Sequence, residues 1–123
     1  MTNTYPKVPP LQNKFLTAMI VDVSTAGQIY VTPGFSGKII NIYSALNGAI
    51  ATAPAVLTAK IGGTAVTGGV ITIADSGSAK GDVDSATPTA KNSFTAAEAI
   101  EIETTGASTN TVSVVVTLEL QAG

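Results

Sequence analysis

The side chains that usually carry chemistry are scarce in this chain of 123 residues, which contains no histidine and no cysteine. Ser-His-Asp and Cys-His nucleophile pairs, zincin and zinc-ribbon sites and disulfide frameworks are therefore excluded. Two carboxylates, Glu101 and Glu103, stand two apart in an alternating segment. On a strand they share one face about 6–7 Å apart, a spacing that suits a glycosidase pair. Because no tryptophan is present to form a sugar platform, we expect a solvated strand face and no enzyme.

A second group of carboxylates lies in one polar segment. Asp75, Asp82 and Asp84 could share a calcium ion, with Gly81 permitting a tight bend. The segment lacks the ligand ladder and closing glutamate of an EF-hand loop, so a solubilising role is the alternative. The glycine pairs form neither a GxGxxG nor a Walker loop and precede no helix. We expect no cofactor and no metal, and the cation question stays open at these three aspartates.

The elements that would position these side chains are short strands. Residues 55–74 read as three strands folded by two glycine-pair turns, Gly62-Gly63 and Gly68-Gly69. Other strands are expected over 15–23, 28–32, 37–46, 100–103 and 112–120. The first is apolar on both sides, so we expect it to be buried on both faces or to lie at an interface.

Alternation predicts which side chains face the core. In the 37–46 strand, Ile40, Ile42 and Leu46 share one face. In the last strand one face carries Val112, Val114, Val116, Leu118 and Leu120. Residues 75–93 are predicted to be a surface loop, and Thr95–Glu98 has a capping-box spacing that predicts one helical turn. Seven to nine such strands predict an all-β fold, an antiparallel two-sheet β-sandwich that is jelly-roll-like.

The amino-acid composition limits the classes of partner that this protein can bind. Charged residues make up 11% of the chain, the net charge is −2, and all six cations are dispersed lysines. This excludes the basic face that nucleic-acid binding requires. No apolar run approaches the length of a membrane span. Since the mean hydropathy is nevertheless positive, at +0.38, we expect much of the surface to be covered by neighbouring subunits.

The N-terminal residues 1–14 show no periodicity and contain three prolines, which predicts an extended arm ahead of a single domain over 15–123. The arm is either a frayed terminus or a segment that docks on a neighbour. In the second case the contact residues are expected to be the following: Tyr5, Val8, Pro9, Pro10 and Leu11.

The central and C-terminal segments carry a family resemblance, from residue 37 onward. The sequences LTAKIGGTAVTGG, ITIADSGSAKGDVDSATPTAKNSF and EAIEIETTGASTNTVSVVVTLEL resemble those of head decoration, or cement, proteins of tailed bacteriophages. The resemblance implies a non-enzymatic protein, often a homotrimer, that binds the major capsid protein on the outer surface of the phage head and stabilises the shell. It implies neither a small-molecule substrate nor a catalytic motif.

Two other functions remain as alternatives. One is a phage head-fibre or adhesin module that binds host cell-surface glycans through the loop 75–93, against which the lack of tryptophan argues. The other is a hydrolase that uses Glu101 and Glu103.

Overall fold

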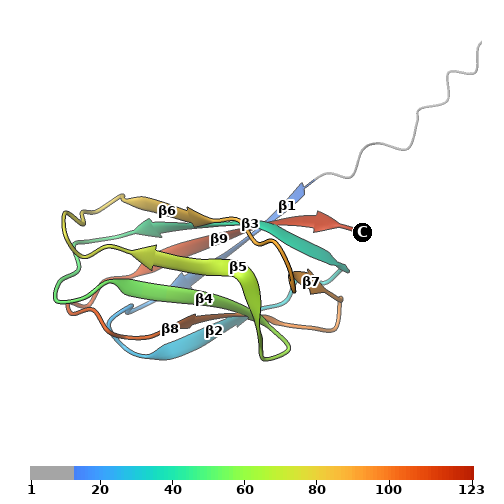
Figure 1. The fold of residues 1–123 in the computed structure, drawn as a ribbon, viewed down its shortest axis with the longest axis horizontal. Helices are drawn as coiled ribbons and strands as arrows, with labels where there is room; N and C mark the ends of the chain where they lie inside the picture. The colour runs from blue at the N-terminus through green and yellow to red at the C-terminus, as the bar shows by residue number, and fades with distance from the viewer. Residues whose placement is uncertain (1–12) are drawn as a thin grey trace, which may run out of the picture.

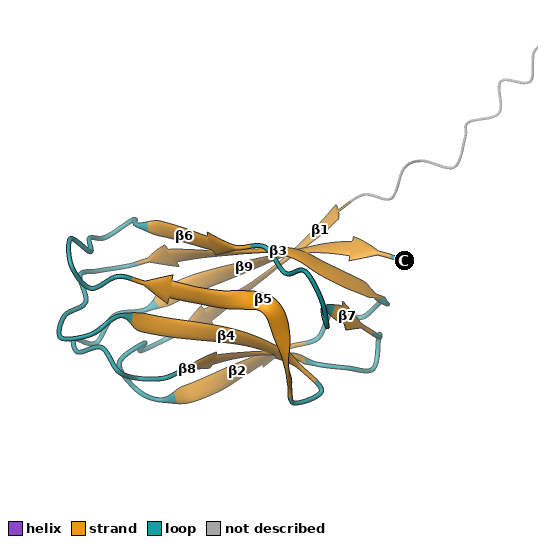
Figure 2. Cartoon of the chain, in the orientation of Figure 1, coloured by secondary structure: helices purple, strands orange, loops and turns teal. Residues whose placement is uncertain are grey.

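The structure, a computed structural model, describes residues 13–123, and within this range the chain forms nine strands and no helix. All strand pairs are antiparallel, and the strands build two sheets stacked face to face (Figure 1, Figure 2). The strands are β1 (Asn13–Ile20), β2 (Gly27–Val31), β3 (Gly37–Leu46), β4 (Ala55–Ile61), β5 (Thr64–Ile73), β6 (Val83–Ala86), β7 (Ser93–Phe94), β8 (Ile100–Thr104) and β9 (Val114–Ala122). The predicted all-β sandwich is confirmed, whereas the predicted closing helical turn is wrong.

Each sheet joins strands that are distant in sequence. Sheet A has the order β1-β9-β3-β6, with β7 also paired to β3, and sheet B has the order β2-β8-β4-β5. The chain passes from one sheet to the other at most connections, so consecutive strands usually face each other across the core. The longest-range pairing aligns β1 with β9 from Asn13↔Gln121 to Ile20↔Val114.

The core lies between the sheets and is made by the inward-facing alternate residues. In β9 the side chains of Val114, Val116, Leu118 and Leu120 are at most 1% exposed, as the alternation predicts. Sheet B supplies the opposing layer: Ala55, Leu57, Ala59, Ile61, Val66, Ile71, Ile73, Ile100 and Ile102. Full burial of each large side chain stabilises the fold by about 1.5–3 kcal/mol, and this apolar layer fixes which face of every strand points inward.

The two glycine pairs play different roles. Gly62 and Gly63 have φ values of 59° and 81° and join β4 to β5 in the predicted hairpin. The second predicted turn is wrong, because β5 continues through Gly68 and Gly69 to Ile73.

Gly68 and Gly69 permit a bulge in β5 and a close approach between β5 and the segment 87–90. The register of β5 against β4 jumps from Thr58↔Val70 to Lys60↔Ala65, and Thr67 pairs instead with Ala90. The Thr67 amide donates to the Ala90 carbonyl over 2.9 Å. A Cβ atom on Gly68 would lie 2.7 Å from the Thr87 carbonyl oxygen, so a side chain here would push the segment 87–90 away.

The structure also differs from two of the predicted burial patterns. The first strand covers 13–20 instead of 15–23, takes up Asn13 and Lys14 from the predicted arm, and buries one face only. Its other face is exposed, with Phe15 62% and Met19 52% exposed. Burial on both faces is therefore wrong, and the alternative, a position at an interface, stays a prediction. In β3 a bulge between Ile39 and Asn41 shifts the alternation, so Ile39 and not Ile40 enters the core.

Two polar segments adopt more local structure than their sequences suggest. Within the predicted loop 75–93, residues Val83–Ala86 pair with β3 as β6, an edge strand held by backbone hydrogen bonds rather than by apolar patterning. The Thr95 amide donates to the Glu98 carboxylate over 2.8 Å, as in a capping box. These residues nevertheless form only a turn, because the chain extends directly into β8.

Candidate interaction surface

The predicted arm contacts fall at the start of the chain. Tyr5, Val8, Pro9, Pro10 and Leu11 lie outside the described residues, so their contacts stay a prediction. The candidate surfaces described below are built from residues 13–123.

The outer face of sheet A, the side of β1, β9, β3 and β6 that points away from the core, carries one continuous line of apolar side chains. The strand register places Met19 beside Val115, Val115 beside Ala45, and Ala45 beside Val83. We call these four residues the apolar row. Its two ends are the most open, with Met19 52% and Val83 68% exposed. Between them the face is hollowed by about 280 Å³. The row crosses the whole sheet, and no charged side chain belongs to it.

A second line of side chains runs next to the apolar row, one level along the strands. It consists of Thr17, Thr117, Tyr43 and Ser85, which the register aligns in the same way. We call these residues the hydroxyl row. Its members are polar but uncharged, so two adjacent levels of this face carry no ionic group.

A carboxylate marks the next level. Glu119 accepts hydrogen bonds from the Asn13 amide at 2.7 Å, the Asn41 amide at 2.9 Å and the Tyr43 hydroxyl at 3.2 Å. The bonds from Asn41 and Asn13 hold the pKa of Glu119 below its usual value. Partial desolvation, and then the carboxylate itself, raise the pKa of Tyr43. This cluster ties β1, β9 and β3 together across the outer face, and its donors are committed to Glu119.

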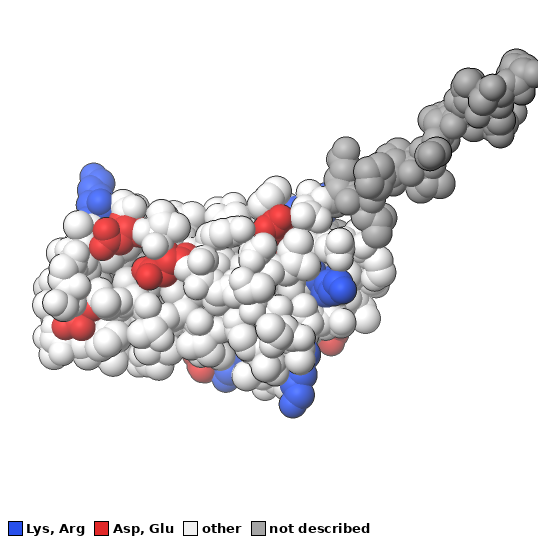
Figure 3. All heavy atoms as spheres, turned by 45° about the horizontal axis from the view of Figure 1, so that its top comes forward, with Lys and Arg blue, Asp and Glu red and all other residues white. Residues whose placement is uncertain are grey.

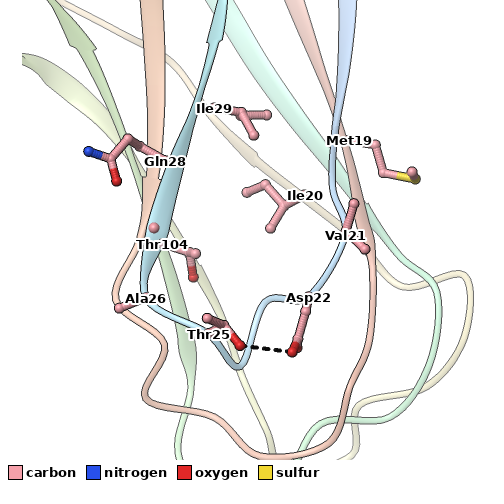
Figure 4. A pocket seen from close by; sticks show the side chains of 10 residues that line it. Met19, Ile20, Val21, Asp22, Thr25, Ala26, Gln28, Ile29 and Thr104 are labelled. Atoms are coloured by element: carbon pink, nitrogen blue, oxygen red, sulfur yellow. Dashed lines mark hydrogen bonds between the residues drawn. The ribbon is translucent and has the colours of Figure 1, made fainter.

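A second hollow, of about 320 Å³, opens at the side of the sandwich where the edge strands β1 and β2 meet. Ile20 and Ile29 point into it, while Met19 and Val21 stand at its rim (Figure 4). Most of its exposed lining is apolar, although four of its ten lining residues are polar: Asp22, Thr25, Gln28 and Thr104. The hollow therefore extends the apolar character of the sheet A face around the edge of the molecule.

The turn that closes this hollow is organised by Asp22. Its carboxylate accepts hydrogen bonds from the Ser24 hydroxyl at 2.6 Å and the Ser24 amide at 2.9 Å. It also accepts a bond from the Thr25 hydroxyl at 2.9 Å (Figure 4). These bonds, with the Ser24 hydroxyl first, lower the pKa of Asp22. The carboxylate therefore shapes the turn that follows β1.

The outer face of sheet B is different, because charged groups occupy it. Lys60 Nζ lies 3.1 Å from Glu103 Oε1, and Glu101 sits beside Lys60 in the register. The hydrogen bond to Glu103 and the attraction between the charges raise the pKa of Lys60. Glu101 and Glu103 do share a strand face, as predicted, but Glu103 is engaged by the lysine rather than directed into a cleft.

The acidic loop offers no assembled cation site. Asp82 uses its carboxylate to accept the Ala79 amide at 2.8 Å. Across residues 13–123, no group of three or more acidic, histidine or cysteine side chains lies close enough to hold a metal ion. Charges are sparse over the view in Figure 3, with wide uncharged areas between them.

The alternation within each strand identifies outward-facing residues, but sequence reasoning missed the apolar row because the row exists only through strand register. In the described part of the chain, no helix is long and apolar enough to cross a membrane. No protein-family model matches the sequence, and the comparison with curated proteins gives no significant match.

Proposed function

We propose that this protein is a decoration protein of a tailed-phage head, which binds the major capsid protein on the outer surface of the assembled shell and stabilises it. The observation that carries the proposal is the outer face of sheet A, where the apolar row crosses four strands and the adjacent hydroxyl row is also uncharged. A face of this kind is typical of a surface that is covered by protein in the working assembly. The proposal takes the identity of the assembly, the phage head, from the sequence resemblance to cement proteins.

The strand order supports a jelly-roll topology within this proposal. Sheets ordered β1-β9-β3-β6 and β2-β8-β4-β5 place the first and last strands side by side, and most connections pass from one sheet to the other. Jelly rolls of eight strands built from two Greek keys have this character, and they occur widely in viral shells. β7 is then an addition to the scheme, paired with the start of β3.

The proposed mechanism is mechanical rather than chemical. A rigid sandwich bound across neighbouring capsid subunits adds contacts that must break before the shell can open, and many copies on one shell add avidity. We further propose that the protein acts as a homotrimer and that residues 1–14, with Tyr5, Val8, Pro9, Pro10 and Leu11, add a contact to the capsid.

The test uses purified heads of the tailed phage that, under this proposal, encodes this chain. The full-length protein should co-sediment with these heads to a saturable stoichiometry and should raise the temperature at which they open. Deletion of residues 1–12, which leaves β1 whole, should weaken binding without altering the circular dichroism spectrum. Absence of co-sedimentation by the full-length protein would refute the function, whereas unchanged binding by the deletion would refute only the role of the arm.

A further inference from the structure

We propose that Glu119 is a positioning residue that latches the start of β1 onto β9 and so fixes the point from which residues 1–12 leave the sandwich. The latch consists of side chains within residues 13–123. Its consequence for capsid binding rests on the proposed function, in which the N-terminal residues contact the shell.

β1 is held unequally along its length. It is an edge strand, so backbone hydrogen bonds join it to its sheet on one side only. At its far end Ile20 is buried, and just beyond it the amide of the buried Val23 donates to the Val112 carbonyl at 2.8 Å. Its first three residues, 13–15, are all exposed. Burial therefore fixes the end of β1 but not its beginning, which is the kind of segment that opens locally in a folded protein.

A side-chain hydrogen bond takes the place of burial at the start of β1. Asn13 Nδ2 donates to Glu119 Oε2 over 2.7 Å. Between residues of the described range 13–123, no other side chain of β1 forms a hydrogen bond or an ion pair. Because the acceptor is a carboxylate, the bond is charge-assisted and stronger than a bond between neutral groups. This one bond is the latch.

Glu119 is itself held from the opposite side. Its other oxygen, Oε1, accepts the Asn41 amide at 2.9 Å and the Tyr43 hydroxyl at 3.2 Å, both from β3. Asn41 is oriented in turn, because its Oδ1 accepts the Thr87 hydroxyl at 3.1 Å and its Nδ2 is left to donate to Glu119. One carboxylate oxygen is thus occupied by β3, and the other is directed to Asn13. The chain of bonds crosses the outer face of sheet A from the segment after β6 to the start of β1.

The first residue of β1 is the junction with the N-terminal residues 1–12. With the latch closed, Asn13 pairs with Gln121 near the end of β9. Separation of the first residues as far as Leu16 would move this junction along the strand by about 10 Å, since a strand rises about 3.3 Å per residue. It would also lengthen the tether, which lowers the effective concentration of any contact made by residues 1–12. The latch therefore favours a contact that needs a fixed starting point.

The experiment measures amide hydrogen exchange of the full-length protein by nuclear magnetic resonance. Asn13→Ala and Glu119→Ala remove the latch from either end, and the double variant tests whether they act through one bond. Gln121→Ala is the matched control, because Gln121 lies on the same strand and face as Glu119 and its side chain forms no hydrogen bond within residues 13–123. All three side chains are at least partly exposed, so the variants should keep their fold, which circular dichroism checks.

We expect Asn13→Ala and Glu119→Ala each to speed exchange of the protected amides in residues 13–16 roughly three- to tenfold. Asn13→Ala should leave the amides between β9 and β3 within about twofold, and the double variant should match Glu119→Ala. Gln121→Ala should leave β1 within about twofold of the unmodified protein. Unchanged exchange in Asn13→Ala would overturn the inference, as would an equal effect of Gln121→Ala or additive effects in the double variant.

Co-sedimentation with purified phage heads separates the latch from the proposed function. Asn13→Ala should weaken head binding by the full-length protein at least about threefold. Failure of the unmodified protein to bind heads, together with the expected exchange pattern, would refute the function and leave the latch supported. Head binding without that exchange pattern would refute the latch and leave the function supported. The expected exchange pattern with unchanged head binding by Asn13→Ala would refute the consequence of the latch for capsid binding.

Discussion

Replacement of a single buried serine should make this protein more stable. Ser44 lies in the middle of β3, is 2% exposed, and has a hydroxyl with no hydrogen-bond partner. Its neighbour in the register, Val116, is fully buried. An unpaired buried polar group costs about 1–3 kcal/mol. Because Ser44→Ala removes that group and leaves only a small void, we expect the free energy of unfolding to rise by about 1 kcal/mol.

The assay is equilibrium unfolding in urea, followed by circular dichroism because the chain has no tryptophan. The midpoint should rise with an unchanged m-value, and the melting temperature should rise by roughly 3–6 °C. Ser85→Ala is the control, since Ser85 is exposed on the neighbouring strand β6 and should change stability by less than about 0.5 kcal/mol. A loss of 1 kcal/mol or more for Ser44→Ala would refute the reasoning, because it would mean that the hydroxyl makes a stabilising hydrogen bond.

Two further predictions concern acid stability and one backbone position. The lowered pKa values of Asp22 and Glu119 mean that these carboxylates stabilise the fold above their usual pKa. Urea midpoints should therefore be level between pH 7 and pH 5 and fall below about pH 4, with a smaller fall for Asp22→Asn; a flat profile to pH 2.5 would contradict this. Gly106 and Gly77 have φ values of 73° and 74°, but only at Gly106 would a Cβ atom strike backbone, that of residues 25–26. Gly77→Ala should cost about 1 kcal/mol and Gly106→Ala at least about 2 kcal/mol more in the same urea assay, and equal costs would show that the loops can separate freely.

The parts of the fold that could be predicted from sequence are those fixed by alternation within a single strand. The core face of β9 and the glutamates of β8 were predicted correctly because each buried residue is followed by a more exposed one. The hairpin at Gly62-Gly63 was predicted because two residues with positive φ suffice to reverse a strand.

The errors have one physical cause, which is that a pairing partner far away in the chain decided the outcome. Gly68-Gly69 carries the same turn signal as Gly62-Gly63. Thr67 nevertheless pairs with Ala90, and β5 continues past the glycines. The bulge at Ile40 is set by the pairing of β3 with β9. In β6 the residues have no apolar alternation at all, and the free backbone edge of β3 makes them a strand.

The candidate surface could not be predicted from the sequence because it is a product of register. Within its own strand each member of the apolar row is a single outward-facing residue, which is common on protein surfaces and needs no explanation. Pairing between β1 and β9, about a hundred residues apart, is what sets Met19 beside Val115. The two adjacent uncharged rows were visible in the sequence only as a low overall fraction of charged residues.

The apolar row does not follow from folding alone. Register in a sandwich is specified by the buried face, because a slip of one residue would carry the core side chains into solvent. The outward side chains are then free to be charged without any cost to the core, as Lys60, Glu101 and Glu103 are on sheet B. On sheet A, by contrast, four strands each place an uncharged apolar side chain at the same level. Since the fold does not require that arrangement, contact with another protein surface is the physical reason we infer for it.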